Sequence, residues 1–492
     1  MSWSVKNFYD GQNVLITGGT GYLGKLLTAK LLATTNVKMI YLIVRLKEGA
    51  DAQQRTNELF DKVIFNKIDK NVFMDKVQSV EGDLMKPGLG MSHANKAFLR
   101  ENINIIFHCA ANMNMSAKLR TAVMTNVNGT TEILDIMKGA KVLKAFVAVS
   151  TAYSFCIHKI IEEKFYDSNM NGKLLLTMVR NMKPSLFDEL SPQIMGNWPN
   201  SYVYTKAVAE NVLQSEGEGI PLALFRPTII TSTVSEPAPG WFGNLYGPME
   251  LNFWCGSSVL TVFNGIPNNH IDTVPGDYVA NAVICVACDV GKKWNENTKD
   301  FKIPVYNFGS YKSPLFVKLH DYLNLPVTCE YPPFERKLST KPFLVIISNK
   351  FVFRIFNFLL HTFRGYLMDK FSIVTKKKTR MSKLYSRIFK LNSVLFYFTT
   401  CEWIVKNDNT KAVWNSMSRE DQSIFPFDTN SVNTEEYYKN QMIGLKKYAL
   451  HEDVKDLPKY KVGKSRINVS LILLMFIFFV VFLVIQNASK SE

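Results

Sequence analysis

The sequence predicts an α/β fold whose main element is a doubly wound parallel sheet carrying a substrate-binding subdomain. Short apolar runs typical of strands recur along the first half of the 492-residue chain, with helical segments between them. A glycine-rich turn joins the first of these runs to a helix, as in many sheets of this class. A basic region and a late apolar run then predict a C-terminal helical domain and a C-terminal transmembrane helix. We expect these parts at residues 9–330, 331–450 and 467–487.

The first strand and helix flank a turn that predicts a phosphate-binding site. Residues 14–16 are apolar, and residues 25–32 have helical periodicity. Between them, Gly18 permits a tight turn, Gly21 lets the backbone approach a pyrophosphate, and Gly24 allows the helix to pack closely on the strand. The N-terminus of the helix then faces the phosphates. We therefore predict a Rossmann-type dinucleotide site that also includes Thr17, Thr20, Tyr22 and Leu23.

The residues after the second strand indicate which dinucleotide binds. The apolar run at 39–44 ends in Arg45, and Lys47 follows two residues later. A site for NAD usually has an acid here to bind the ribose hydroxyls, whereas a basic residue suits a 2′-phosphate. The sequence therefore predicts NADPH as the cofactor.

Two later strand ends complete the predicted cofactor site. Asp83 and Leu84 follow the third strand, where a carboxylate can accept a hydrogen bond from an adenine amino group. The strand that reaches His108 continues into small residues, so we expect Ala110 to pass close beside the cofactor. We expect His108 itself to pack at the strand end rather than to act as a base.

A hydroxyl pair and a tyrosine–lysine pair form the predicted catalytic set. Ser150 and Thr151 end a further apolar strand, and open parallel sheets bind ligands at that edge. Tyr202 and Lys206 are four residues apart, so they share one helix face, whereas Tyr204 has the wrong spacing to the lysine. A nearby ammonium lowers the pKa of a tyrosine. Tyr202 can then protonate a carbonyl oxygen as hydride reaches the carbon, while Thr151 or Ser150 holds that oxygen.

In this order, these features match the extended short-chain dehydrogenase/reductase pattern. The chain more closely resembles the alcohol-forming fatty acyl-CoA reductases, and the resemblance extends over residues 9–450. It rests on the stretches 17–24, 149–154, 161–166, 196–210, 226–230, 236–248, 396–403, 407–410 and 437–448.

The resemblance implies a four-electron reduction. NADPH would reduce a long-chain acyl-CoA to a primary alcohol through an aldehyde-level intermediate, with release of CoA. Tyr202 and Lys206 would take the proton-donor and lysine roles, with Thr151 or Ser150 as the polarising hydroxyl. Asn126 resembles the asparagine that stabilises the active-site helix in related reductases. The resemblance also adds three cofactor-binding residues, which are Pro227, Thr228 and Ile229.

Two other functions stay open at this point. One is an extended reductase that acts on a sterol or another small lipid carbonyl. The other is a catalytically silent membrane protein that senses NADP(H), although the intact Tyr202–Lys206 pair argues against it. Residues 112–115 and 251–255 depart from the family pattern, and the bulky aromatic residues at 251–255 leave the preferred acyl chain length open. We expect residues 155–200, a long segment for this superfamily, to help cover the acyl chain.

The net charge of +16 is concentrated in one region. Residues 331–390 contain 14 Lys or Arg and two acids, so they carry +12 of the total. This charge suits CoA phosphates or an anionic membrane. No aromatic-interleaved basic motif accompanies it, so we expect no nucleic-acid partner. The seven cysteines are scattered and form no disulfide framework, and we expect Cys285 and Cys288 to lie on a buried helix rather than at a metal site.

Two apolar segments raise the question of a membrane. Residues 343–363 form one, with Lys350, Arg354, Asn357 and His361 spaced as a stripe along a helix. This helix either lies in a membrane interface or packs on its own domain. The other segment, 467–487, contains an almost wholly apolar run at 469–485 and has basic residues before it, which predicts a single-pass anchor with the catalytic body in the cytosol. We expect the membrane to be that of the endoplasmic reticulum or a peroxisome.

The sequence leaves the oligomeric state of the protein open.

Overall fold

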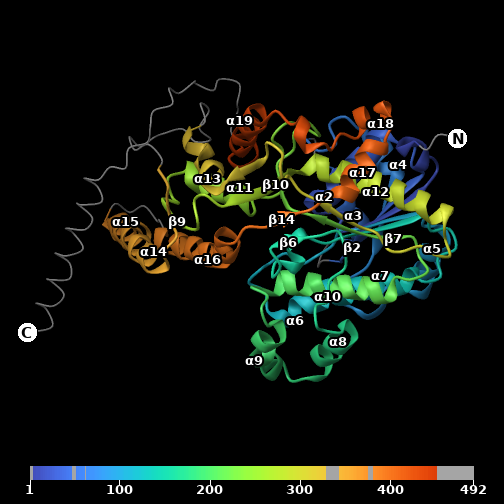
Figure 1. Ribbon diagram of the computed structural model, residues 1–492, viewed down its shortest axis with the longest axis horizontal. Helices are drawn as coiled ribbons and strands as arrows, with labels where there is room; N and C mark the ends of the chain where they lie inside the picture. Colours follow the sequence, from blue (N-terminus) through green and yellow to red (C-terminus); the bar gives the residue numbers. More distant parts are fainter. Residues whose placement is uncertain (1–3, 47–50, 61–62, 329–342, 375–379, 452–492) are drawn as a thin grey trace, which may run out of the picture. The chain divides into compact units, whose positions relative to one another are not determined.

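The computed structural model describes residues 4–46, 51–60, 63–328, 343–374 and 380–451 (Figure 1). The chain divides into two compact units, each built from separate stretches of sequence. Unit 1 comprises residues 1–244, 272–316 and 403–434, and unit 2 comprises 245–271, 317–402 and 435–492. The predicted boundary after residue 330 lies outside the described residues, so the predicted linear division stays a prediction.

A seven-stranded, fully parallel sheet forms the centre of unit 1, and its order is β11-β7-β5-β4-β1-β2-β3. From β1 the chain builds one half of the sheet through β2 and β3, and it then returns to build the other half from β4 outward. This reversal between β1 and β4 is where ligands bind in doubly wound sheets. The Rossmann-type sheet predicted from the sequence is therefore confirmed. Its strands are β1 Asn13–Thr17, β2 Met39–Val44, β3 Val77–Glu81, β4 Ile105–His108, β5 Ala145–Val149, β7 Leu222–Pro227 and β11 Val305–Phe308.

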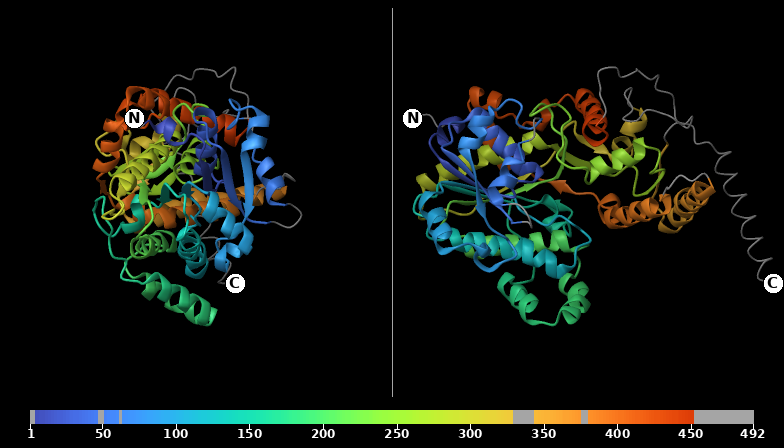
Figure 2. Two further views of the ribbon diagram at one scale, coloured as in Figure 1. Left: turned by 90° about the vertical axis from the view of Figure 1, so that its right-hand side faces the viewer. Right: turned by 180° about the vertical axis from the view of Figure 1, so that it is seen from behind.

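Helices cover both faces of this sheet (Figures 1 and 2). On one face α2 packs against α12, and on the other α7 packs against α10. The first part of α12 is buried because it is rich in Ala, Val and Cys; Cys285 and Cys288 lie there, as expected. The helices on and around the sheet are α1 Val5–Phe8, α2 Tyr22–Thr34, α3 Ala52–Asn57, α4 Lys70–Lys76, η1 Pro87–Gly90, α5 His93–Asn102, α6 Leu119–Ala122, η2 Val123–Val127, α7 Asn128–Met137, η3 Ala152–Phe155, α10 Ser201–Glu216 and α12 Gly276–Glu296.

The long segment between β5 and α10 forms two helices that pack beside α6, η2 and α10. Its residues also enter the core, because Trp198 is buried and its indole Nε1 donates to the Ser154 carbonyl at 2.7 Å. The remaining elements of unit 1 are β6 Ile160–Ile161, α8 Gly172–Asn181, α9 Pro184–Met195, β8 Ile229–Thr231, β14 Ile404–Val405, α17 Asp408–Ser416, α18 Arg419–Ile424 and η5 Thr429–Ser431. Three elements have residues in both units, namely β10 His270–Pro275, β12 Phe316–Lys318 and α19 Thr434–Gly444.

Unit 2 has its own core, to which Leu251, Phe263, Leu323 and Ile388 contribute. A two-stranded parallel sheet, β9 paired with β13, lies within it. Its elements are α11 Pro248–Gly256, β9 Val262–Asn264, α13 Leu319–Thr328, β13 Val345–Ile347, α14 Lys350–Asn357, η4 Phe358–Phe363, α15 Arg364–Val374, α16 Met381–Thr400 and η6 Leu445–Ala449. Whether a separate helical domain spans 331–450 stays a prediction.

The segment at 343–363 is not one helix. It contains strand β13, and α14 begins only at Lys350, because the Asn349 side chain caps its first turn. The expected polar stripe is divided: Lys350 and Arg354 are exposed, whereas Asn357 and His361 are buried. His361 Nε2 accepts from the backbone N–H of Thr261 at 3.1 Å, and its Nδ1 is 2.9 Å from Asn357 Oδ1. These hydrogen bonds compensate for the burial of polar side chains.

The predicted anchor at 467–487 lies outside the described residues. Among the residues that are described, no helix is both long and apolar enough to cross a bilayer.

Candidate active site

The β1–α2 turn has the close packing that the glycine spacing predicts. Gly18 has φ +72°, and a Cβ there would lie 2.9 Å from the Ala110 Cα atom. A Cβ on Gly24 would lie 2.3 Å from the Gly18 carbonyl oxygen. Gly21 is the N-cap of α2 and supplies no side-chain acceptor, so the first N–H groups of the helix stay available to a phosphate. The turn therefore fits a dinucleotide.

Two side chains of this turn have structural partners. Thr17 is buried; its Oγ1 accepts from the Ala110 N–H at 3.1 Å and lies 2.8 Å from His108 Nδ1. The Tyr22 hydroxyl donates to the Thr231 carbonyl at 2.8 Å. Thr20 and Leu23 are half-buried at the same turn.

His108 packs at the end of β4, as expected. Its Nε2 lies 3.1 Å from Thr130 Oγ1, and burial together with the nearby Lys206 ammonium lowers its pKa to about 3. A histidine with this pKa is neutral at working pH and cannot take up a proton there.

The ends of β2 and β3 hold the predicted nucleotide-selecting residues. Arg45 is exposed directly after β2, and Lys47 lies outside the described residues. A second arginine, Arg55 of α3, donates to the Arg45 carbonyl from Nη1. After β3, Asp83 Oδ1 accepts from the Met85 N–H at 3.0 Å, which holds the carboxylate in a turn. Its neighbour Leu84 is positioned through its carbonyl, which accepts from Asn128 Nδ2 at 2.7 Å.

The two hydroxyls after β5 have different surroundings. Ser150 is buried and donates from Oγ to the Glu210 carboxylate. Thr151 Oγ1 accepts from the Tyr153 N–H at 3.2 Å as the N-cap of η3, an interaction that leaves its own proton available. The sequence left the choice between them open, and the hydrogen bonds favour Thr151 as the donor to a substrate oxygen.

Helix α10 carries the predicted tyrosine and lysine. Tyr202 lies half-buried in its first turn, which Asn200 caps, and α10 packs against η3. Lys206 is buried, and its Nζ donates to the Val149 carbonyl at 2.8 Å. Burial lowers the pKa of this ammonium to about 8, while Glu210 and Cys109 oppose the shift. Tyr204 is fully buried, and burial raises its pKa to about 12, so it is unsuited to proton transfer.

A buried ion pair that the sequence reasoning missed supports this set. Glu210 follows Lys206 by one further helical turn, and it accepts from Arg226 Nε at 3.1 Å as well as from Ser150. Both charged side chains are fully buried. Arg226 also donates to the Lys164 carbonyl at 3.0 Å, which ties down the segment after β6. The spacing of residues 202, 206 and 210 was the available signal in the sequence.

Asn126 connects the helix to the neighbouring loop. Its Nδ2 donates to Thr205 Oγ1 at 2.9 Å, and its Oδ1 accepts from the Asn112 N–H at 2.7 Å. Thr205 lies between Tyr202 and Lys206 on α10. The contact therefore fits the helix-stabilising role that the resemblance implies for Asn126.

The segment after β7 contributes less than expected through its side chains. Thr228 is buried, and its hydroxyl donates to Asp272 Oδ1 at 2.9 Å. Pro227 ends β7, and Ile229 begins β8 with a half-buried side chain. Only Ile229 of the three has a partly accessible side chain.

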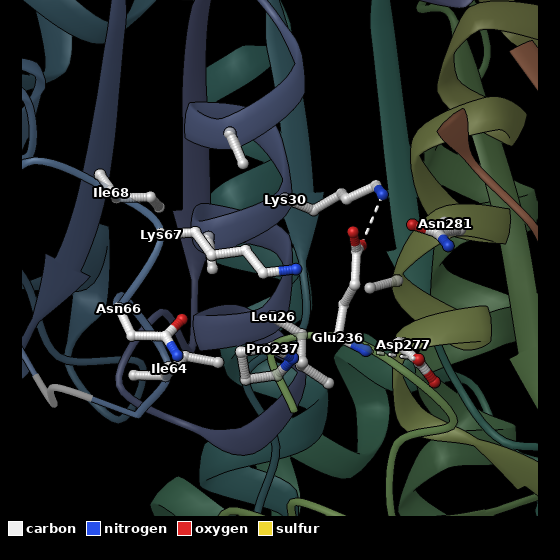
Figure 3. Close-up of a pocket in the computed structure, with 13 residues that line it drawn as sticks. Leu26, Lys30, Ile64, Asn66, Lys67, Ile68, Glu236, Pro237, Asp277 and Asn281 are labelled. Atoms are coloured by element: carbon white, nitrogen blue, oxygen red, sulfur yellow. Dashed lines mark hydrogen bonds and ion pairs between the residues drawn. The ribbon is translucent and has the colours of Figure 1, made fainter. Parts of the chain in front are cut away.

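A small cavity of about 40 Å³ lies elsewhere in unit 1, between α2, residues 64–68 and α12 (Figure 3). Lys30 and Glu236 form an ion pair at 2.5 Å beside it, and Lys67 points toward it. None of the predicted site residues lines this cavity, so it is separate from the candidate active site.

The parallel sheet, its glycine turn and the Tyr-x-x-x-Lys helix together define a reductase with a site for a nicotinamide dinucleotide. Two family models, both described as "Male sterility protein", match residues 16–283 and 360–452; the first is an NAD-binding model. The chain is 34% identical over 467 residues to the fatty acyl-CoA reductase wat of Drosophila melanogaster, covering 94% of this chain and 89% of that one. It is 33% identical to the fatty acyl-CoA reductase 2 of Homo sapiens, covering 94% and 90%. The chain belongs to the fatty acyl-CoA reductase family.

Solved structures with a similar fold include the terminal R domain from the myxalamid PKS-NRPS pathway, with a TM-score of 0.58, 17% identity and 93% coverage of both chains. Another is the reductase domain of a nonribosomal peptide synthetase from Mycobacterium tuberculosis, with a TM-score of 0.56, 18% identity and coverage of 90% and 93%. At this identity the likeness supports the Rossmann-type fold alone.

Proposed function

We propose that this protein reduces long-chain fatty acyl-CoA to a primary alcohol with NADPH and releases CoA. The observation that carries the proposal is the placement of Thr151 after β5, as the N-cap of η3, and of Tyr202 and Lys206 on α10, beside a turn that fits a dinucleotide. The relatives of this chain are named fatty acyl-CoA reductases.

The bound nicotinamide supplies hydride in each of two reductions. In the first, Thr151 donates a hydrogen bond to the thioester carbonyl oxygen, and Tyr202 protonates that oxygen as the carbonyl carbon accepts hydride. The resulting thiohemiacetal loses the CoA thiol and becomes an aldehyde. In the second, the same two side chains bind and protonate the aldehyde oxygen, which gives the alcohol. The balance is two hydrides and two protons per acyl group.

Lys206 keeps the tyrosine able to donate and recover this proton. Its buried ammonium lies one helical turn from Tyr202, and a neighbouring positive charge favours the phenolate. Because the pKa of Lys206 is lowered to about 8, we expect the catalytic rate to fall as pH rises through that value.

NADPH is proposed over NADH because two arginines lie beside the end of β2, and a basic residue after this strand suits a 2′-phosphate. Arg45 is exposed after β2, and the Arg55 guanidinium is adjacent to it. Arginine can bind a phosphate through two parallel hydrogen bonds. No acidic residue stands at the position that follows β2.

We also propose a membrane-associated location. The apolar run at 467–487, with its preceding basic residues, suits a single-pass anchor that leaves the catalytic body cytosolic, in the endoplasmic reticulum or a peroxisome.

Residues 155–200 are proposed to help cover the acyl chain. Deletion of this segment is too severe a test of that role because Trp198 is part of the core. Replacing the exposed Leu174 and Leu186 by polar residues tests the role better, because these changes leave the core intact while acyl-CoA turnover is measured.

The test is product identification with the purified full-length chain. NADPH or NADH is supplied with acyl-CoAs of several chain lengths, and a sterol ketone serves as the competing substrate. We expect alcohol, free CoA and two NADPH consumed per acyl group, as measured by mass spectrometry and absorbance. Aldehyde as the end product would contradict the four-electron reaction. Turnover of the sterol ketone alone would assign the chain to the competing activity.

A further inference from the structure

We propose that α14, η4, α15 and the adjoining part of α16 form an interfacial face that lies against an anionic membrane surface. This inference concerns unit 2 alone. It is independent of the proposed catalytic reaction and of the anchor at 467–487.

Large apolar side chains are exposed on this face. Phe351 is 71% exposed and Phe371 is 70% exposed. Of the 20 large apolar side chains that are exposed among the described residues, nine lie between residues 351 and 389. Such a concentration within 39 residues sets this segment apart, because large apolar side chains that are exposed are more often scattered singly. The nine are Phe351, Val352, Ile355, Phe358, Tyr366, Leu367, Met368, Phe371 and Phe389.

The spacing of the side chains along α14 and η4 explains which of them are exposed on this face. Phe351, Ile355 and Phe358 are spaced by four and three residues and share a helix face, whereas Phe353 and Leu360 pack into the core beside Val262. The polar Asn357 and His361 are buried and hydrogen-bonded to each other and to Thr261. In an ordinary surface helix the exposed face is polar and the buried face apolar. Here the exposed face keeps apolar residues although buried positions are polar.

The charges around the face indicate the partner. The described residues between 350 and 390 include eight Lys or Arg and a single acid, Asp369. Asp369 is half-buried, and its carboxylate accepts from the Met381 and Ser382 N–H groups at the start of α16. Seven of the eight basic side chains are exposed, namely Lys350, Arg354, Lys370, Arg380, Lys383, Arg387 and Lys390. Aromatic and aliphatic side chains beside lysine and arginine are the composition of helices that lie in a bilayer interface.

A second copy of the chain fits this face less well. A symmetric dimer would place the same basic side chains opposite one another. Glu250 offsets Arg387, at 2.9 Å, but the other six exposed lysines and arginines would still face their copies. An anionic leaflet offsets the charge and also accepts the apolar side chains. The lysine and arginine side chains can extend to the lipid headgroups, while the phenylalanine rings enter the boundary between the headgroups and the acyl chains. Figure 1 shows α14, α15 and α16 side by side, as one surface would require.

The test places a fluorescent label on the face of the full-length protein. Phe351→Cys and Phe371→Cys are labelled with an environment-sensitive dye and reconstituted in vesicles of phosphatidylcholine with or without phosphatidylserine. Some of the lipids carry a quencher in the acyl chain. The matched control is Glu435→Cys, exposed at the acidic start of α19 in the same unit. Unsubstituted protein taken through the same labelling gives the background from native cysteines.

We expect quenching of at least about twofold at positions 351 and 371 in phosphatidylserine vesicles, and none at 435. Replacing Lys350 and Lys370 by Glu should weaken the response to phosphatidylserine by about fivefold or more per charge. Equal quenching in neutral and anionic vesicles would overturn the proposal. A second result would also overturn it: dye emission that is already shielded from water without lipid, and that the lipid quencher does not change. The apolar run at 469–485 or a second copy of the chain would then cover the face. A label at Phe476 reports the anchor separately, and NADPH turnover of each variant reports folding.

Discussion

At the residue scale, the candidate site depends on two adjacent hydroxyls and on the charges that surround one ammonium. Ser150 points to Glu210, whereas Thr151 caps η3 and retains a proton to donate. Lys206 is buried near the same carboxylate, so its pKa reflects both burial and that negative charge. The roles of these side chains can therefore be separated by single substitutions.

Thr151→Val should lower kcat about 100-fold, because it removes the proposed donor to the substrate oxygen at nearly constant volume. Thr151→Ser should recover most of the rate, since it restores the hydroxyl. The matched comparison is Ser150→Ala, which should mainly lower the free energy of unfolding, by about 1–3 kcal/mol, because a buried carboxylate loses a hydrogen bond. Steady-state kinetics and urea unfolding measure the two effects. A larger loss of kcat in Ser150→Ala would contradict the assignment.

Glu210→Gln should shift the alkaline limb of the kcat/KM profile to lower pH. Glu210 raises the pKa of Lys206 against the effect of burial, so removing its charge lets that pKa fall below about 8. The ammonium then deprotonates at a lower pH, and activity is lost earlier as pH rises.

Because Arg226 would be left buried without its ion-pair partner, the same profile is measured on Glu210→Gln/Arg226→Met, which restores neutrality. A purely structural role for Glu210 predicts a lower rate at every pH with the limb unmoved, and that outcome would refute the positioning role.

At the scale of elements, nucleotide selection depends on a strand end and on the helix that folds back over it. Arg45 follows β2 directly, so its position could be predicted from the strand pattern alone. Arg55 lies on α3, and only the packing of α3 brings its guanidinium to the Arg45 carbonyl. The same limit applies to α14: spacing placed Lys350 and His361 on one stripe, but the exposure of one and the burial of the other depend on Thr261, 100 residues earlier than His361.

Arg45→Ala should raise KM for NADPH about tenfold or more and leave KM for NADH nearly unchanged, because a hydrogen bond to a charged phosphate is lost only with the phosphorylated cofactor. The double variant Arg45→Ala/Arg55→Ala should raise KM for NADPH further, again with little change in KM for NADH. Lys38→Ala is the control, since this exposed lysine precedes the opposite end of the same strand. Equal increases in KM for NADPH and NADH would mean that the arginines do not select the 2′-phosphate.

At the scale of the whole molecule, local patterns predicted the parts and long-range contacts determined how each unit is assembled. The seven-stranded sheet and the Tyr202–Lys206 helix follow from residues close together in sequence. The partners that organise the site do not: Thr228 meets Asp272, and the segment at 403–434 returns to complete unit 1. No periodicity in one stretch identifies a partner in another, which is why the ion pair Glu210–Arg226 and the discontinuous units were not predicted.

Glu163 joins three such stretches, and its pKa makes their assembly depend on pH. It follows β6, and its carboxylate accepts from the Asn307 N–H at 3.0 Å and from the Asn409 N–H, in the first turn of α17, at 2.6 Å. Burial outweighs these hydrogen bonds and raises the pKa of Glu163 from 4.5 to about 7. Between these values the folded protein binds a proton that the unfolded chain lacks, so this group makes the folded state less stable as pH rises.

The free energy of unfolding of wild type, relative to Glu163→Gln, should therefore fall between pH 5 and 7, by at most about 3 kcal/mol, and stay level above pH 8. Urea unfolding of both proteins across this range measures the difference. Glu162→Gln is the control: the side chain of this neighbour is 40% exposed, and its pKa is lowered by Lys164 and Lys406, so its contribution is already complete above pH 5. Parallel stability curves for wild type and Glu163→Gln would show that the Glu163 carboxyl does not titrate with folding in this range.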